Sequence, residues 1–192
     1  RLAHRAANLA LGNPAGATAI EVSRGGLVLD CMAGMAMLAV AGGGFVVTVD
    51  DRRQGSWSAF PVRSGSRVTI RPGPWGSWAY LAFSAVLETE TWLGSAATHA
   101  HSGFGGGKLT AGDVLQGELT AGAGIAHQFP CPVFARPRSN LRVVLGPQDR
   151  FFAPDTIATF LGSAFTLTDA YDRMGVRLRG PILLPNAALT LP

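Results

Sequence analysis

Short extended stretches separated by glycine, proline or aspartate run through most of this chain and constrain its fold more than any other feature. Stretches of this length are too short for stable helices, and their regular alternation with turns predicts an antiparallel β-sandwich or β-barrel. The predicted strands span residues 19–23, 27–30, 36–41, 45–50, 67–71, 78–84, 113–118, 141–145, 165–168 and 176–179.

Two short segments have helical character instead. In residues 2–11, apolar side chains recur at the spacing of one helical face, and Gly12-Asn13-Pro14 ends the segment. A second helix is predicted over residues 154–161, where Pro154 and Asp155 suit a first turn and Gly162 suits the end. The chain is therefore predicted to be mainly β with few short helices.

The composition indicates a folded protein with a core of its own. Of the 192 residues, 47% are hydrophobic and only 15% are charged, which excludes a disordered chain. The longest uncharged run, residues 31–49, contains Gly42-Gly43-Gly44, which suits a turn between strands and would break a membrane-spanning helix. The first residues lack the apolar region of a signal peptide. We therefore expect a cytoplasmic protein that does not bind membranes.

The basic residues do not form the pattern of a nucleic-acid-binding protein. The formal net charge is +4, and fifteen arginines and the single Lys108 carry the positive charge. The arginines are scattered, with Arg52-Arg53 as the only adjacent pair, and no basic run with interleaved aromatics occurs. We expect no nucleic-acid partner.

A proline-rich stretch, residues 128–140, contains Pro130, Pro132 and Pro137 and is typical of a linker. It divides the chain into residues 1–135 and residues 136–192. The second part is too short to build a convincing core alone. It is expected to pack on the first part, on a partner or on further chain.

A glycine-rich stretch over residues 102–110 resembles a phosphate-binding loop at first sight. Ser102 and Leu109 stand where the Walker pattern requires glycine and a hydroxyl residue, so that pattern is excluded. Two interpretations remain, a plain loop and a loop that binds an anion through backbone N–H groups and Lys108. Nearby, His99 and His101 have no third ligand at a suitable spacing, so no metal site is predicted.

Two further groups of polar residues are candidate site residues. Ser95 and Thr98 lie near the histidines in the chain, without the Gly-x-Ser-x-Gly elbow of a serine hydrolase. Asp172 and Arg173 lie where the predicted strand 176–179 begins, and Arg177 lies on it. A carboxylate beside guanidinium groups suits recognition of a carboxylate or amide substrate, and the alternative is a turn held by a surface ion pair.

Four stretches of the chain carry a resemblance to a known family. They contain Asn8 with Gly12-Asn13-Pro14, Tyr80-Leu81-Ala82 with Leu93-Gly94-Ser95, Gly112-Asp113, and Leu141-Arg142-Val143 and Gly146-Pro147 with Asp172-Arg173-Met174-Gly175, Arg177-Leu178 and Gly180. In these motifs the sequence resembles the KipA-like family, whose members are also called 5-oxoprolinase subunits, allophanate hydrolase subunit 2 or biotin-dependent carboxyltransferases. The order and spacing of the motifs agree across nearly the whole chain.

The chain departs from the family pattern in several places. Ser84-Ala85 replaces a Gly-Gly pair, Ser95-Ala96-Ala97-Thr98 replaces Ser-Arg-Ser-Thr, and Gly107-Lys108 replaces Gly-Arg. A lysine in place of an arginine loses the planar two-pronged donor. We also expect the chain to stop before the segment that completes the second half of the family's fold.

The resemblance implies a fold of two cyclophilin-like antiparallel β-barrel subdomains. Residues 1–135 would form the first, and residues 136–192 the start of an incomplete second. It further implies a KipI-like partner subunit, ATP, and a small amide substrate, with opening of 5-oxoproline to glutamate as the expected activity. One alternative is carboxyl transfer to urea-type amides, which would involve biotin. The other is a non-catalytic subunit that antagonises a kinase inhibitor.

The resemblance and the charge pattern together assign roles to seven residues. Asp172 and Arg173 are the expected catalytic residues, with Asp172 as an acid, base or orienting group. The expected substrate-binding residues are Arg177, Ser95, Thr98, Lys108 and Asp113. Among them, Arg177 would bind a carboxylate or phosphate, and Lys108 would stabilise developing negative charge.

Overall fold

The structure, a computed structural model, describes residues 1–99, 101–120, 124–171 and 175–187. It divides the chain into two compact units, Arg1–Arg138 and Ser139–Pro192. The boundary falls inside the proline-rich stretch over residues 128–140.

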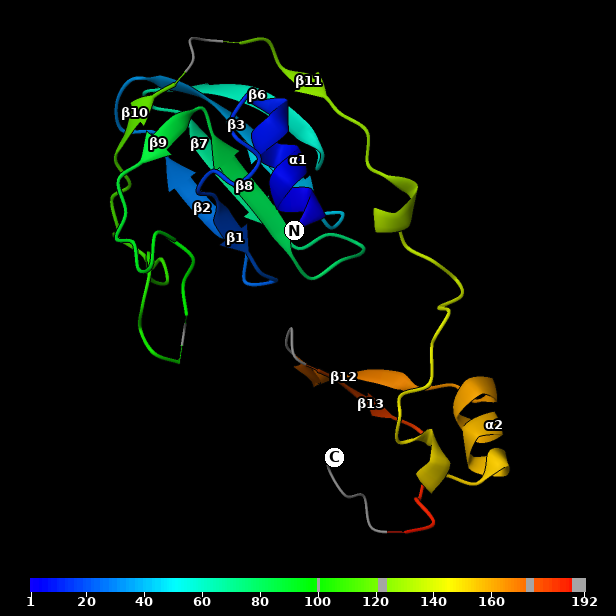
Figure 1. Ribbon diagram of the computed structural model, residues 1–192. Coiled ribbons are helices and arrows are strands. Elements are labelled where there is room, and N and C mark those ends of the chain that lie inside the picture. Colours follow the sequence, from blue (N-terminus) through cyan, green and yellow to red (C-terminus); the bar gives the residue numbers. More distant parts are fainter. Residues whose placement is uncertain (100, 121–123, 172–174, 188–192) are drawn as a thin grey trace. The chain divides into compact units, whose positions relative to one another are not determined.

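Two larger antiparallel sheets, a two-stranded ribbon and one α-helix build the first unit (Figure 1). The five-stranded sheet has the order β1-β8-β3-β6-β11, and the four-stranded sheet has the order β2-β7-β4-β5. The first sheet comprises β1 (Ile20–Val22), β8 (Ala79–Phe83), β3 (Met35–Gly42), β6 (Ser58–Arg63) and β11 (His127–Gln128). The second comprises β2 (Leu27–Asp30), β7 (Arg67–Arg71), β4 (Val46–Val49) and β5 (Arg52–Arg53). The mainly β prediction is confirmed, and strand pairing among the described residues does not close either sheet into a barrel.

The central strand β3 is buried on both faces, which explains the uncharged run in the sequence. Its Leu38 and Val40 point into the core between the two sheets, which also contains Phe60 and Ile70. Alternate residues of the same strand, such as Ala39, pack in a second core on the other face. A strand covered on both faces needs apolar residues at every position, whereas a strand with one exposed face would alternate.

The helix α1 (Leu2–Ala10) covers the outer face of the five-stranded sheet. Its Ala7 is fully buried and belongs to the second core together with Ala41 and Ala82. Small side chains on both elements let the helix backbone approach the sheet closely. The predicted helix over residues 2–11 is confirmed.

The sequence missed four strands and placed two wrongly. The missed strands are β5, β6, β9 (Ala85–Leu87) and β11. The predicted strand over residues 113–118 is wrong, because the chain turns at Asp113 and the strand β10 is Gly117–Leu119. The predicted strand over residues 141–145 is also wrong, because no described strand pairs with this segment.

In the second unit, α2 (Pro154–Gly162) precedes a two-stranded antiparallel sheet of β12 (Thr166–Tyr171) and β13 (Val176–Arg179). The predicted helix over residues 154–161 and the predicted strand over residues 176–179 are confirmed. Large apolar side chains remain at the surface of this unit, and Leu141 and Val144 are 81% and 97% exposed. No helix among the described residues has the length and apolar character of a membrane span.

A surface ion pair joins β2 to β7. Arg67 donates from Nε and Nη2 to the two carboxylate oxygens of Asp30, at 2.6 and 2.8 Å, and the residues are cross-strand partners. The hydrogen bonds from Arg67 hold the pKa of the Asp30 carboxyl below its usual range.

The contribution of the Asp30–Arg67 ion pair to the stability of the fold is predicted to depend on pH. Because the pKa of Asp30 is lowered in the folded state, the pair stabilises the fold above the usual carboxyl pKa, and the contribution disappears as pH falls through the lowered pKa. The melting temperature of wild type should therefore exceed that of Asp30→Asn at about pH 7, and the difference should shrink as pH falls through the lowered pKa of Asp30. A difference that stays constant over this range would contradict the prediction.

Candidate functional site

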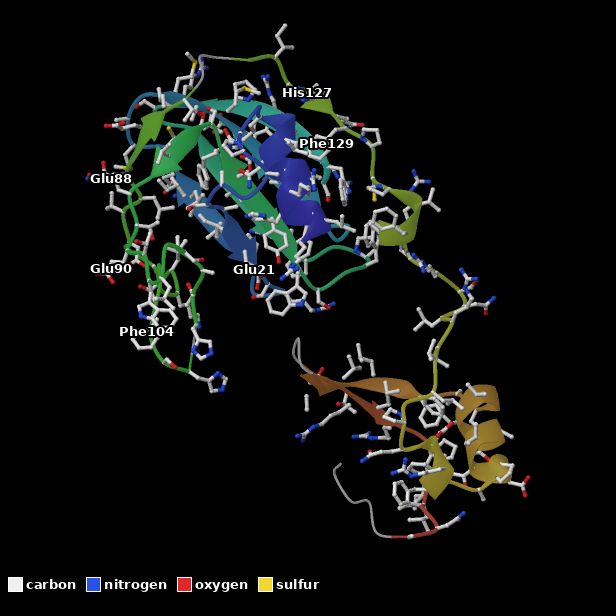
Figure 2. All side chains as sticks on the ribbon, viewed as in Figure 1. Glu21, Glu88, Glu90, Phe104, His127 and Phe129 are labelled. Carbon is white, nitrogen blue, oxygen red and sulfur yellow. The ribbon has the colours of Figure 1, made fainter. Side chains whose placement is uncertain are left out.

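Four of the predicted site residues lie in one long loop of the first unit. We call residues 88–116 the site loop; it leaves the sheet after β9 and returns to β10. β9 and β10 pair antiparallel, and Glu88 N–H donates to the Gln116 carbonyl at 2.8 Å, so both ends of the loop leave one ribbon. Figure 1 shows the loop in green below β9 and β10, and Figure 2 labels Glu88, Glu90 and Phe104 on it.

Hydrogen bonds across the site loop hold its outgoing limb against its returning limb. The N–H of His99 donates to the carbonyl of Phe104 at 2.9 Å, and that of Gly106 donates to the carbonyl of Ala96 at 3.0 Å. The rings of Trp92 and Phe104 stack with their centroids 4.5 Å apart and an angle of 6° between their planes. The loop is therefore a cross-braced structure.

The hydroxyl groups of Ser95 and Thr98 serve the loop itself. Ser95 Oγ accepts from the N–H of Ala97 at 3.1 Å, and Thr98 Oγ1 donates to the carbonyl of Gly107 at 2.8 Å. Both side chains are exposed. Thr98 fixes the residue before Lys108, which is itself exposed to solvent.

The glycines of the loop allow its two limbs to approach closely. A Cβ at Gly105 would overlap the carbonyl oxygen of Ala97, and a Cβ at Gly106 would lie 2.5 Å from Oγ1 of Thr89. The N–H groups of Gly103 and Gly106 are donated to carbonyls within the loop. These two N–H groups are therefore not available to an anion, and the close approach of the two limbs explains the glycines at positions 105 and 106.

Asp113 closes a turn at the end of the loop. Its two carboxylate oxygens accept from Thr110, one from the N–H at 2.7 Å and one from the hydroxyl at 3.1 Å. This is the arrangement of a carboxylate that stabilises a turn. It also explains why Gly112-Asp113 stands out as a motif in the sequence.

The two histidines do not form a metal centre with other side chains of the described chain. The rings of His99 and His101 lie 6.1 Å apart between centroids. No group of three or more histidine, cysteine, aspartate or glutamate side chains among the described residues could hold a metal ion.

The other predicted site residues belong to the second unit. Arg177 lies on β13, and its carbonyl accepts from the hydroxyl of Thr168 on β12 at 3.0 Å. Arg177 and Arg179 line an open hollow of about 660 Å³, together with Phe160, Phe165 and Thr168. Asp172 and Arg173, the predicted catalytic residues, lie outside the described residues. Arg177 is thus the predicted site residue that the structure places in this unit.

Two features of the site region were missed by the sequence reasoning. The sequence gives only a weak indication of the Trp92–Phe104 stack, namely one aromatic residue before the glycine-rich stretch and one within it. Ser84 stands where the resembling family has glycine, and it is buried. Its hydroxyl accepts from the N–H of Met37 at 2.9 Å and its own N–H donates to the carbonyl of Met37 at 2.8 Å, which ties the start of the β9–β10 ribbon to β3.

Comparison with known families and proteins gives consistent matches along the chain. The family model described as "Carboxyltransferase domain, subdomain A and B" matches residues 1–190. A 5-oxoprolinase subunit of Escherichia coli (strain K12) is 29% identical over 183 residues, which cover 93% of this chain and 58% of that protein. The putative urea carboxylase of Emericella nidulans is 30% identical over 195 residues, which cover 94% of this chain and 15% of that protein.

Solved structures match as well. The crystal structure of TTHA0988 superposes with a TM-score of 0.75 at 32% identity, covering 95% of this chain and 67% of that chain. The urea amidolyase of K. lactis superposes with a TM-score of 0.73 at 26% identity, covering 96% of this chain and 12% of that chain. The chain therefore spans only part of the relatives that it matches.

Proposed function

Because the chain belongs to the family of carboxyltransferase domains with subdomains A and B, we propose that it is a subunit of an ATP-dependent amidohydrolase complex that opens 5-oxoproline to glutamate. The similarity to the 5-oxoprolinase subunit of Escherichia coli over 93% of this chain carries the proposal. A second relative of the same name, from Haemophilus influenzae, is 30% identical over 190 residues. The chain spans 58% of the first relative, so the activity is proposed for the whole complex.

The proposed reaction converts 5-oxoproline, ATP and two water molecules into glutamate, ADP and phosphate. Phosphoryl transfer to the lactam oxygen makes the ring carbon electrophilic, and water then attacks that carbon. The ring C–N bond breaks, the nitrogen takes up a proton, and a second water releases the phosphate. Negative charge develops on the lactam oxygen and its phosphoryl group, so positioned cations would lower the barrier.

Three basic residues suit the charges in this reaction. Arg173 and Arg177 are proposed to bind the substrate carboxylate or the phosphoryl group, because a guanidinium matches both with two parallel hydrogen bonds. Lys108 is proposed to stabilise the developing negative charge. Asp172 is proposed as the acid, base or orienting group beside Arg173.

The remaining predicted binding residues are proposed to act through the site loop. Hydrogen bonds within the loop involve the hydroxyls of Ser95 and Thr98 and the carboxylate of Asp113. These bonds support a role in holding the conformation of the site loop. The N–H groups of Gly103 and Gly106 are donated within the loop and are not proposed to bind ATP. ATP is assigned to no residue of this chain.

The proposal includes a KipI-like partner subunit and a cytoplasmic location. The designation of the relatives as subunits supports a complex of several chains. We further propose that residues 1–135 correspond to a first carboxyltransferase-type subdomain, and residues 136–192 to the start of a second cyclophilin-like subdomain. The exposed apolar side chains of the second unit support its burial against other chain.

A second candidate function is carboxyl transfer from carboxybiotin to urea or a related amide. The 30% identity to the putative urea carboxylase over 94% of this chain favours it. In this reaction bound biotin would supply the carboxyl group that is transferred to the substrate nitrogen. No residue of this chain is assigned to biotin.

An assay of the complex with two substrates separates these functions. The chain is purified with the proposed partner subunits, and ADP formation is followed with 5-oxoproline, or with urea, bicarbonate and a biotinylated carrier protein. The proposal expects ADP formation that depends on 5-oxoproline, with glutamate as the product. ADP formation that depends on urea and bicarbonate, with no glutamate from 5-oxoproline, would establish the second function instead.

Replacement of Arg177 by lysine tests its proposed role in the same assay. Arg177→Lys keeps the charge but loses the planar pair of donors, so kcat/KM for 5-oxoproline should fall about tenfold. The matched control is Arg150→Lys, an exposed arginine of the same unit that lines neither described hollow, and it should leave kcat/KM unchanged. Equal activities of the two variants would remove Arg177 from the site.

A further inference from the structure

We propose that the stacked rings of Trp92 and Phe104 are positioning residues that hold Lys108 in place for an anionic group of the substrate. The inference rests on the proposed function for the identity of the substrate. Trp92 lies on the outgoing limb of the site loop and Phe104 on the returning limb, so their stack joins the two limbs. The rings lie nearly parallel, at 6°, with centroids 4.5 Å apart.

A series of contacts leads from this stack to Lys108. Next to the stack, the backbone of Trp92 pairs with that of Ser95, at 2.8 and 3.0 Å. The N–H of Gly106 donates to the carbonyl of Ala96 at 3.0 Å, and the hydroxyl of Thr98 donates to the carbonyl of Gly107 at 2.8 Å. The series ends one residue before Lys108.

The loop needs such a brace because its hydrogen bonds alone hold it weakly. The side chains of Thr98 and Lys108 are exposed, and a hydrogen bond exposed to water contributes little net stability. Gly107 has a φ of +79°, a left-handed conformation that glycine adopts readily, so the position of the backbone before Lys108 depends on the hydrogen bond from Thr98. The stack adds apolar contact between flat surfaces, although Trp92 and Phe104 remain 48% and 43% exposed.

Because the side chain of lysine is flexible, the backbone position of Lys108 determines where its ammonium group can act. Its ammonium group is a compact point charge on a flexible stem, without the fixed geometry of a guanidinium. A lysine that stabilises a developing anion must therefore have its backbone fixed by the surrounding structure. In this chain the braced limbs of the site loop provide that support.

Because Lys108 is the only lysine in the chain, its order can be measured directly. Labelling with ¹⁵N-lysine gives a single backbone amide signal, whose order parameter reports how well residue 108 is held. We expect about 0.8 for the wild type and below about 0.6 for Phe104→Ala. Phe104→Tyr keeps the stacking ring and should retain the wild-type value. Val114→Ala, at a 74% exposed position of the same loop away from the stack, is the control and should retain it too.

Activity of the complex tests whether the brace acts through Lys108. Phe104→Ala should lower kcat for 5-oxoproline about tenfold with KM nearly unchanged, because the interaction that is lost forms as the charge develops, and Phe104→Tyr should restore kcat. In a Lys108→Ala background, Phe104→Ala should change kcat less than about twofold, because the group that the brace positions is gone. A full tenfold effect in that background would overturn the inference.

The two measurements keep failure of the brace apart from failure of the proposed function. A complex that does not act on 5-oxoproline refutes the proposed function, and the order parameter then decides the inference alone. A fall in Phe104→Ala but not in Val114→Ala supports the brace. An unchanged order parameter at residue 108 overturns the inference, whatever the activity.

Discussion

Replacing Asn8 by alanine is expected to lower the free energy of unfolding by roughly 3–5 kcal/mol, the largest effect of any single substitution considered for this chain. Asn8 is 0% exposed and lies on α1, where it faces the sheet. Its amide nitrogen donates to the carbonyl of Ala17 at 2.9 Å and to that of His4 at 3.3 Å. Its side-chain oxygen accepts from Nδ2 of Asn13 at 3.1 Å.

Asn13 extends this network from the helix to the sheet. Its Nδ2 also donates to the carbonyl of Phe83 in β8 at 2.8 Å, and its N–H donates to the carbonyl of Asn8 at 3.0 Å. Alanine at position 8 would leave the carbonyl of Ala17 without the Asn8 donor and Nδ2 of Asn13 without the Asn8 acceptor. Each buried polar group that is left unpaired lowers the free energy of unfolding by about 1–3 kcal/mol.

Urea denaturation of the wild type and of Asn8→Ala measures this effect. Arg5→Ala, on the exposed side of the same helix, is the matched control and should stay within about 0.5 kcal/mol of the wild type. If Asn8→Ala were as stable as Arg5→Ala, the network would contribute nothing to the fold.

Replacing Gly43 by alanine is expected to destabilise the fold by about 3 kcal/mol. Gly43 is buried in the turn between β3 and β4, where its N–H donates to the carbonyl of Trp78 at 2.9 Å. A Cβ at this position would lie 2.8 Å from Cα of Gly76 and 2.8 Å from the carbonyl oxygen of Trp75. Both are backbone atoms, so the clash cannot be relieved by rotating a side chain.

Gly16→Ala is the matched control for this substitution. A Cβ at Gly16 would meet nothing within 4 Å, so alanine should leave stability unchanged or raise it by a few tenths of a kcal/mol. Thermal unfolding of the two variants at the same pH compares them. A melting temperature of Gly43→Ala equal to that of Gly16→Ala would show that the turn opens without cost.

The sequence predicted the elements whose residue pattern matches the burial that the structure shows. The strand over residues 27–30 was predicted with its observed bounds, and the turn expected at Gly42-Gly43-Gly44 begins at the last residue of β3 and leads to β4. Strand β6 was missed because Pro61 within it argues against a strand. In the structure β11 pairs only with Ser58 and Ala59, so no described strand needs an N–H group from Pro61 on that edge.

The segment over residues 141–145 failed for the opposite reason. Its β-branched residues Val143 and Val144 favour a strand, but a strand also needs a neighbour with free backbone groups. The sheet of the second unit has the two strands β12 and β13, and neither pairs with this segment. The residue pattern of a single segment does not show whether a neighbouring strand is available to pair with it.

The sequence predicted which residues are candidates for a site, but it did not predict the hydrogen bonds that these residues make. Ser95, Thr98, Lys108 and Asp113 were predicted as binding residues, and the structure gathers them in the site loop. Three of them bond within the loop, because a serine, threonine or aspartate in a loop satisfies nearby backbone groups first. The roles of Asp172, Arg173 and Arg177 remain proposals that rest on the family motif.

Omission of this chain from the complex tests the central claim most directly. Glutamate formed from 5-oxoproline and ATP is measured with the partner subunits alone and after this chain has been added. We expect glutamate and ADP to appear in equal amounts, and only when the chain is present. Glutamate formation at the same rate by the partner subunits alone would contradict the claim that this chain is a working part of the enzyme.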